Sequence, residues 1–439
     1  MTRRTHVRAP ARIGGRPDPC TTSIPFATTF PVTGCHPSRS TCRLPLALLC
    51  AAAGAVAAHE RPSVVFSGFG TLGYAAVDHS EAEYRTGGAR DGADASGSFE
   101  LDTRIGVQAD AALGHALSAT VQLQARERSD GDVGVEAEWA FLRWRPDDRV
   151  AIRAGRMSLP AFAISDYRSV GYANVPIRSP DGLYSIIPLE RLDAADVSLE
   201  AQTGDTLWGL QVVAGRSSGN FDGTDFDARD FLAVIVDAEH GSARLRLAHS
   251  RTDLTLTFEG IEAVRQGLGV AATFDPGLVP ARDDFDRDRV RTIFEAIGGS
   301  YDPGHWFVDG EYVRRRIDGF AANVDGWAVS AGWRLGAFTP YALASAYRDV
   351  DPDRRVQLPP LEQLAPLQGL LDGAYTKQDQ RSFGVSLRWD VAPNIALKSQ
   401  VEHVASRFTG VSLYRSSDDT RAPSGTDVTL LAISMDVLF

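Results

Sequence analysis

Residues 117–128 read LSATVQLQARER, and their apolar and polar side chains alternate one by one. Val121 and Leu123 fall on one side of this segment, whereas Gln122, Gln124 and Arg126 fall on the other. A period of two residues indicates a β-strand with one apolar and one polar face. The same pattern returns in segments of about ten residues from residue 63 to the end of the chain, which predicts an all-β protein.

Alternating segments of this kind occur sixteen times, and the connections between them alternate in length. The segments lie near 64–77, 99–112, 117–128, 135–145, 150–156, 194–203, 206–216, 229–239, 242–252, 291–301, 305–315, 324–335, 338–348, 379–391, 395–408 and 427–439. Short turns stand at 114–115, 146–148, 204–205, 240–241, 302–304, 335–336 and 393–394. Long polar connections stand at 78–98, 157–193, 217–228, 253–290, 316–323, 349–378 and 409–426, with a shorter one at 129–134.

The two sets of connections predict one architecture. Sixteen antiparallel strands with both ends on one side need seven turns on that side and eight loops on the other. A water-soluble sheet would need a second layer over its apolar face, whereas a closed barrel in lipid satisfies its own backbone hydrogen bonds. We therefore expect a transmembrane antiparallel up-and-down β-barrel of about sixteen strands. Its short turns are periplasmic and its long loops are extracellular.

The first 58 residues differ from the rest of the chain. The apolar run from Leu44 to Ala58 follows Arg39 and Arg43 and ends in small residues, which is typical of a cleaved secretory signal peptide. A run of about fifteen residues is short for a membrane-spanning helix. We interpret 1–58 as a leader that combines an upstream-extended start with a signal peptide, and 59–439 as the β-barrel domain.

Cysteine usage and charge agree with export. All four cysteines (Cys20, Cys35, Cys42 and Cys50) fall in the leader, so the mature chain has no thiol to oxidise in the periplasm. The leader also holds 7 of the 45 basic residues and 1 of the 56 acidic residues, which leaves 38 basic and 55 acidic residues and a net charge of −17. This balance excludes nucleic acid as an expected partner.

The aromatic residues and the two terminal strands are more specific. All seven tryptophans fall inside predicted strands, which is typical of the aromatic girdles of membrane barrels. Along the last strand, Leu431, Ile433, Met435 and Val437 share a face with the terminal Phe439. The first strand, FSGFGTLGY at 66–74, interleaves glycines with aromatic residues. In these features the chain resembles the Gram-negative outer-membrane porins over residues 63–439.

The resemblance has several implications. It implies a location in the outer membrane, contact with outer-membrane lipid and lipopolysaccharide, and recognition of Phe439 as an assembly signal by the barrel-assembly machinery. It also implies a homotrimer. The connection at 129–134 leaves the trimer open, because trimeric porins use a longer loop there to contact a neighbouring subunit.

The connection at 157–193 is the predicted constriction loop, because porins fold the loop in this place inward. It is rich in aromatic and aliphatic residues, so much of it must pack against the barrel wall. Its charged residues are candidates for the narrowest point of a channel, and they are Asp166, Arg168, Arg178, Asp181, Glu190 and Arg191. The short acidic-glycine motif of enterobacterial porins is absent from this loop.

The polar phase of the strands predicts the residues that line the lumen. If the apolar phase faces lipid, the lumen wall is notably basic. It contains Arg104, Gln108, Gln122, Gln124, Arg126, Arg153, Arg244, Arg246, Glu311, Arg334, Arg388 and Lys398. A transverse field between this wall and acidic loop groups would order water and pass small polar molecules while disfavouring apolar ones.

Other patterns in the chain are less specific. Residues 68–73 satisfy G-x-G-x-x-G, but no amphipathic helix follows them, so we do not expect a nucleotide site. The mature histidines are scattered without metal-ligand spacing, so we expect no metal and no cofactor. Helical spacing at 258–268 and 361–371 predicts short loop helices. For the acidic run at 283–288, two interpretations stay open: an ordinary solvated surface, or a bridge through divalent cations to the phosphates of lipopolysaccharide.

The sequence therefore favours an outer-membrane channel for passive diffusion of ions and small hydrophilic solutes, without enzymatic activity. A substrate-selective or anion-selective channel, for example for phosphate, is the nearest alternative because of the lumenal arginines. A barrel that acts as an adhesin or an enzyme with a closed lumen is an alternative from another class. Ion current after reconstitution would distinguish the channels from the closed barrel.

Overall fold

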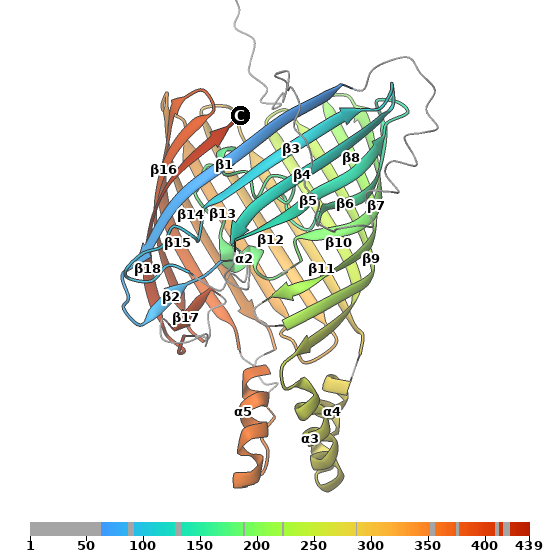
Figure 1. Ribbon diagram of the computed structural model, residues 1–439, viewed down its shortest axis with the longest axis vertical. Helices are drawn as coiled ribbons and strands as arrows, with labels where there is room; N and C mark the ends of the chain where they lie inside the picture. The colour runs from blue at the N-terminus through green and yellow to red at the C-terminus, as the bar shows by residue number, and fades with distance from the viewer. Residues whose placement is uncertain are drawn as a thin grey trace, which may run out of the picture.

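The computed structural model describes residues 63–86, 92–127, 133–187, 189–221, 224–286, 288–351, 356–374, 377–408, 412–415 and 422–439. The predicted leader at 1–58 lies outside the described residues. Figure 1 shows one barrel, with helices projecting from the end opposite the C-terminus.

Sixteen strands of the described residues form a closed barrel, in the order β1-β18-β16-β15-β14-β13-β12-β11-β10-β9-β8-β7-β6-β5-β4-β3. Every neighbouring pair is antiparallel, which confirms the predicted fold class. The strands are β1 (Val64–Val77), β3 (Arg104–Ala112), β4 (Leu117–Glu127), β5 (Val133–Trp144), β6 (Val150–Ser158), β7 (Arg191–Thr203), β8 (Thr206–Phe221), β9 (Thr224–His240), β10 (Ala243–Phe258), β11 (Val290–Tyr301), β12 (Trp306–Ile317), β13 (Val324–Trp333), β14 (Phe338–Asp349), β15 (Asp379–Ala392), β16 (Ile395–Ser406) and β18 (Asp427–Leu438).

The barrel closes where the first strand meets the last. β1 pairs with β18 from Phe69↔Leu438 to Val77↔Leu430. The backbones of Gly68 and Phe439 also exchange two hydrogen bonds, of 2.7 and 3.0 Å. A Cβ on Gly68 would lie 2.3 Å from the ring of Phe439. Glycine at this position therefore leaves room for the ring of the terminal residue to pack against the first strand.

Several boundaries differ from the sequence prediction. The connection predicted at 217–228 is wrong, because β8 continues to Phe221 and β9 begins at Thr224. The strand predicted from residue 99 begins only at Arg104. Two short strands, β2 (Ala82–Tyr84) and β17 (Leu413–Arg415), were not predicted, and they pair with each other in the loops.

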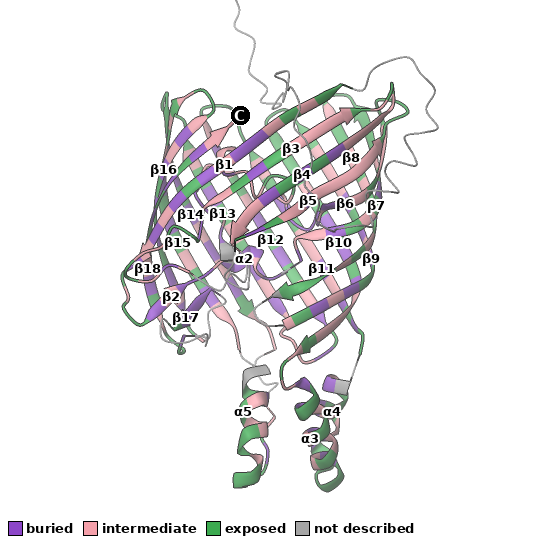
Figure 2. Ribbon diagram, viewed as in Figure 1, coloured by how far each residue is buried: buried purple, intermediate pink, exposed green. Residues whose placement is uncertain are grey.

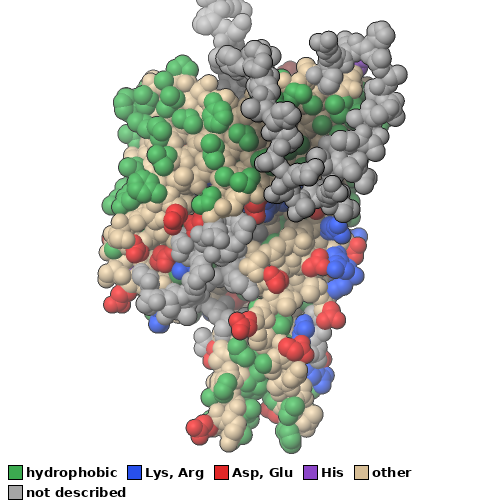
Figure 3. All heavy atoms as spheres, viewed as in Figure 1, with side chains coloured by type: hydrophobic (Ala, Val, Ile, Leu, Met, Phe, Trp, Pro, Cys, Tyr) green, Lys and Arg blue, Asp and Glu red, His purple; other side chains and the backbone are tan. Residues whose placement is uncertain are grey.

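Exposed apolar side chains cover much of the outside of the barrel, and Figure 3 shows hydrophobic side chains on the part away from the helices and charged side chains nearer to them. Along β18, Leu431 is 55% exposed and Ile433 is 60% exposed, whereas Leu430, Ala432 and Ser434 beside them are buried. Figure 2 shows this change of burial along the strands. In a water-soluble protein so large an apolar surface would be covered, so the outer face is the lipid face.

Aromatic side chains gather near the short turns. Trp306 stacks on Trp333, and Phe338 stacks on Trp389. Exposed Trp144 lies at the end of its strand, so these residues form an aromatic girdle at the end of the barrel that carries the short turns. Trp139 is an exception to the predicted girdle, since its indole N–H donates to Ser158 Oγ at 2.7 Å and its ring lines an interior cavity.

The predicted loop helices are present. α3 (Ile261–Phe274), the 3₁₀ turn η2 (Pro276–Leu278) and α4 (Val279–Asp286) connect β10 to β11, and η3 (Glu362–Leu364) with α5 (Ala365–Ala374) lies between β14 and β15. Val264, Leu268 and Leu371 are fully buried in one cluster, so the two loops pack on each other beyond the barrel (Figure 1). No described helix combines the length and apolarity that a bilayer crossing requires.

Candidate functional site

The connection between β6 and β7 lies inside the barrel and reaches several walls. Its 3₁₀ turn η1 (Gly171–Ala173) contacts β1 and β18, and its short helix α2 (Asp181–Tyr184) contacts β13, β14 and β15. Figure 1 shows α2 within the outline of the barrel. The connection leaves β6 and returns to β7, which lie opposite β14 and β15 in the closed strand order, so it must cross the lumen and narrow it.

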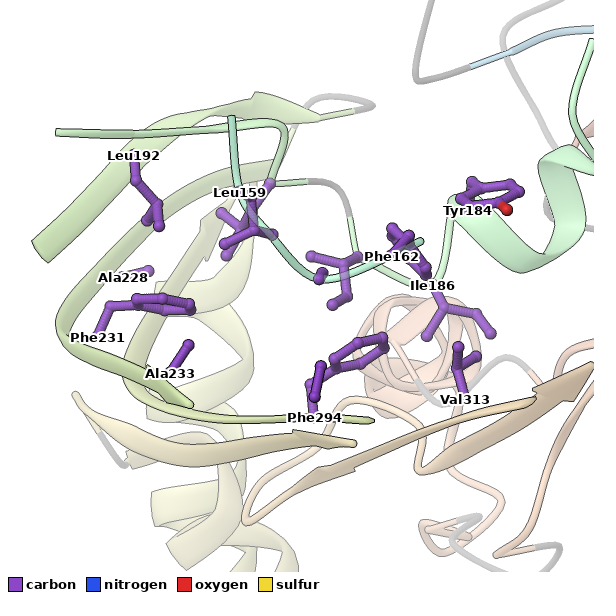
Figure 4. Packing of buried hydrophobic residues seen from close by; sticks show 14 of the residues in the cluster. Leu159, Phe162, Tyr184, Ile186, Leu192, Ala228, Phe231, Ala233, Phe294 and Val313 are labelled. Carbon is purple, nitrogen blue, oxygen red and sulfur yellow. The ribbon is translucent and has the colours of Figure 1, made fainter. Parts of the chain in front are cut away.

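Apolar residues hold one side of the loop against the wall. Figure 4 shows Phe162 between Tyr184 and Phe294 of β11. The ring centroids lie 4.6 and 5.4 Å from Phe162, both with edge-to-face geometry. Leu183 and Ile186 are also buried in this cluster, with residues of β8, β9, β12 and β13. This packing explains why a loop of a barrel is so rich in aliphatic and aromatic residues.

A buried cation anchors the loop to the wall of β16 and β18. Lys398 Nζ donates hydrogen bonds to the carbonyl oxygens of Gly171, Asn174 and Pro176 at 2.7, 2.7 and 3.2 Å. The same atom lies 2.8 Å from Asp436 Oδ2, and both side chains are almost completely buried. A buried ammonium needs its donors satisfied, so the loop backbone and Asp436 together neutralise and solvate it.

Neighbouring side chains extend this anchor. Arg388 donates to the carbonyl oxygens of Tyr172 and Asn174 at 2.6 and 3.0 Å. Arg178 was predicted to lie at the narrowest point of the channel. It lies 3.2 Å from Asp102 with both side chains buried, so it is part of the anchor. Arg388 and Lys398 were predicted as lumen wall, and the structure places both beneath the loop.

A second group of charges holds the loop where it returns to β7. The carboxylate of Glu190 pairs with Arg126 of β4 and with Arg168 of the loop itself, the latter at 2.7 Å. Burial alone would raise the pKa of Glu190, but the two guanidinium groups outweigh it and lower the pKa to about 2. Arg191 pairs with Glu136 at 2.7 Å.

Most of the remaining basic residues that were predicted for the wall form ion pairs with acids of the wall or its turns. Arg153 pairs with Asp196, and Arg246 and Arg244 pair with Asp237 at 3.0 and 3.1 Å. Arg334 pairs with Asp302 at the periplasmic turn, and Arg104 Nε donates to the carbonyl oxygen of Asp102. The wall is therefore charge-paired rather than uniformly basic, which corrects the sequence prediction.

Three cavities adjoin the loop inside the barrel. The first, of about 310 Å³, lies between the loop and the wall of β10 to β14, and the second, of about 320 Å³, lies against β5 to β10. They share Arg244 and Arg246. The third, of about 40 Å³, separates the loop from Gln122, Glu138 and Trp139, and it shares Asp166 with the second.

Asp166 is therefore the loop carboxylate beside open space. It forms no ion pair within the part of the chain that the structure describes. Asp181 begins α2. Residues that sequence reasoning missed include Arg143, Glu138 and Trp139, which line the second or third cavity. The alternation in 135–145 could have found Arg143, but a register shift beside Gln122 changes the phase of β5 before that position.

Other chemistry has little support in the described residues. No group of three or more His, Cys, Asp or Glu residues among them has the geometry of a metal site. His249 lies 3.3 Å from Glu295 on the outer face, away from the loop.

Comparison with known proteins gives a family and a fold. A family profile described as Gram-negative porin matches residues 46–409, and no curated protein matches the sequence. Among solved structures, the outer membrane channel DcaP of Acinetobacter baumannii is 10% identical with a TM-score of 0.51, over 86% of this chain and 97% of that chain. OmpF of Salmonella typhi, in a complex with daunomycin, is 12% identical with a TM-score of 0.50 over the same shares. An anion-selective porin from Comamonas acidovorans is 11% identical with a TM-score of 0.49, over 86% and 100%.

Proposed function

Because the chain belongs to the Gram-negative porin family and is an outer-membrane channel for passive diffusion, we propose that solutes pass beside Asp166, between the loop and the wall of β4 to β10. The observation that carries the proposal is that Asp166 lines both the third and the second cavity. The opposite side of the lumen is occupied by the Lys398 anchor. The route is therefore eccentric in the barrel.

The charges along this route favour general diffusion. The third cavity is lined by Asp166, Arg168, Glu138 and Glu190, so both signs stand at the narrow part. Fixed charges of opposite sign on facing walls orient water and small polar solutes, and they disfavour apolar solutes that cannot replace the water. We assign the channel no catalytic step.

A preference for anions is the second candidate. Arg143, Arg145 and Arg149 line the second cavity, and none of them forms an ion pair with a described carboxylate. Arg143 also stands directly opposite Arg153 across β5 and β6. Like charges placed opposite each other are unfavourable, and a passing anion would relieve the repulsion.

Reversal potentials in a salt gradient test the route and the preference together. We expect Asp166→Asn to shift selectivity towards anions and Arg143→Gln to shift it towards cations. Asp283→Asn, on exposed α4 far from the lumen, is the matched control and should change neither. Unchanged selectivity in both lumen variants would reject the route. An unchanged Arg143→Gln alone would reject the anion preference.

The oligomeric state of the channel is a proposal that is based on the family. We propose a homotrimer in which the barrels pack wall to wall. Native mass of the detergent-folded protein tests this, and a monomeric mass at all protein concentrations would reject it. Contacts with the barrel-assembly machinery through Phe439 are part of the same proposal.

A further inference from the structure

Charged side chains form a ladder across the outer face of β10 to β14. Register pairs His249 with Glu295, Glu295 with Arg314, Arg314 with Asp325, and Asp325 with Arg348. After His249 the sign alternates at every strand. Outward-facing opposite charges on adjacent strands attract each other, so the ladder is locally stable.

The next outward-facing row towards the periplasm is apolar. Leu247, Ile297, Tyr312 and Trp327 form it through the same registers, and they are 42–48% exposed. Ionised groups do not face hydrocarbon, so the change from one row to the next marks the extracellular edge of the membrane core. On β12, the nine residues from Trp306 to Arg314 span roughly 26 Å along the strand, or roughly 20 Å after tilt.

Arginines crowd the outer face just beyond this edge. Ile293 stands opposite Arg251 on β10 and opposite Arg316 on β12, and Arg291 lies two residues further along β11. Arg314 lies on the same outward face of β12 as Arg316, two residues closer to the membrane core. We call Arg251, Arg291, Arg314, Arg316 and Arg348 the outer arginine patch.

Nearby acids do not balance the patch. Including Arg289 and Arg381, seven arginines face five carboxylates, those of Asp230, Asp253, Glu295, Asp325 and Asp379, the last of which stands opposite Arg348. Of the patch, Arg251, Arg291 and Arg348 form no ion pair with any carboxylate in the described ranges. The excess is notable because the whole chain carries a formal charge of −11. Unpaired guanidinium groups held close together repel unless an anion lies among them.

We propose that the outer arginine patch binds the phosphate groups of a lipid in the extracellular leaflet. Guanidinium groups bind phosphate through paired, charge-assisted hydrogen bonds. The lipid is favoured over free phosphate because the apolar row of Leu247, Ile297 and Trp327 continues directly from the patch. A headgroup on the arginines therefore places its acyl chains on these side chains.

The arrangement has a structural consequence for the barrel in its membrane. A phosphate on the patch fixes the depth of β10 to β12 relative to the headgroups, on the wall whose loops carry α3 and α4. The acidic loop residues repel the same headgroups, so they would stay above the leaflet.

Lipid retention by the folded full chain tests the proposal. Folded barrels are incubated with phosphatidylethanolamine vesicles that contain either bisphosphorylated lipid A or the same lipid A without phosphates, and retained lipid is counted by native mass spectrometry. The parent should retain the phosphorylated form preferentially. Arg251→Gln with Arg291→Gln should lower this retention at least fivefold, on the order expected for two arginines at a lipid surface.

The variants are chosen so that folding is preserved. Arg251 and Arg291 are exposed and unpaired, so their loss leaves no carboxylate alone. Arg251→Lys with Arg291→Lys keeps the charge and should retain an intermediate amount of lipid. Arg145→Gln with Arg149→Gln removes the same charge at the periplasmic end and is the matched control.

Four results would overturn the proposal. They are equal retention of dephosphorylated lipid A, equal retention by the Gln double variant, an equal loss in the periplasmic control, and complete displacement by inorganic phosphate. Displacement would mean a general anion site. A change in oligomeric mass without a change in lipid retention would instead mark the patch as a contact between proteins, which also contradicts a lipid site.

Discussion

Replacing Lys398 with methionine should both destabilise the barrel and release its inner loop. The Lys398 and Asp436 side chains are 0% and 1% exposed, so Lys398→Met leaves a carboxylate buried without its cation. Removal of one partner of such a pair costs about 3–5 kcal/mol. Asp436 keeps its hydrogen bond from Thr71 at 2.5 Å, which places the expected loss near the lower end of that range.

The same substitution removes the ammonium that holds three loop carbonyls. Arg388 still binds those of Tyr172 and Asn174, and Gly171 keeps the backbone N–H of Asn174, but Pro176 loses its donor. Residues 171–176 should therefore move more freely, and open-channel current should become larger and noisier. Denaturant unfolding followed by tryptophan fluorescence measures the first effect, and single-channel recording measures the second.

Two further variants separate charge burial from loop anchoring. Lys377→Met changes the only other lysine of the chain, in an extracellular loop, and should alter stability by less than about 0.5 kcal/mol. Lys398→Met with Asp436→Leu removes both charges, so stability should largely return while the current stays noisy. If Lys398→Met unfolds within 1 kcal/mol of the parent and conducts identically, the anchoring role is refuted.

Three other predictions concern closure, pH and the loop helices. Gly68→Ala should displace the ring of Phe439 and lower the yield of heat-modifiable barrel, whereas Gly70→Ala, whose Cβ would lie 3.4 Å from its neighbour, should fold normally. The pKa of Glu190 is lowered to about 2, so its stabilising ion pairs are fully present above the usual carboxyl range near pH 4.5 and are lost as pH falls towards 2. Protease resistance of the loop around Arg168 should hold from pH 7 to about 4 and fall as the pH approaches 2, and a loss above pH 5 would contradict this. Leu268→Ala should raise protease sensitivity of α3 and α5, at a local cost of about 2–5 kcal/mol, without altering channel current.

The strands could be predicted from sequence because one face meets lipid over nearly their whole length. Alternation then follows the pleat without interruption, as in β1, whose predicted and observed limits coincide. Prediction failed at 217–228, where the register shifts between Gly215 and Ser217 and Asp230 adopts a φ of 51°. These irregularities change the phase of the alternation along the strands. The sequence pattern of a continuous hairpin was therefore interpreted as a loop.

The sequence could place several candidate residues on the polar faces of their strands, but it could not predict how they pair. The alternation that placed Arg153 on the polar face says nothing about Asp196, because the strand that carries Asp196 follows a long loop. Likewise, the role of Lys398 depends on the path of residues 171–176, more than 220 positions earlier. Such contacts are set by how the loop packs on the wall, and a sequence pattern with a period of two contains no information on that packing.

Planar-bilayer recording of the folded full-length barrel tests the central claim most directly. If water fills the eccentric route beside Asp166, insertion should give uniform, ohmic current steps, and Asp166→Asn should change their ion selectivity but not their occurrence. The barrels must be shown to be folded, by their heat-modifiable migration on gels, and to be inserted, by protection from protease. Absence of current from such barrels would contradict the claim, because it would mean that the inner loop closes the lumen.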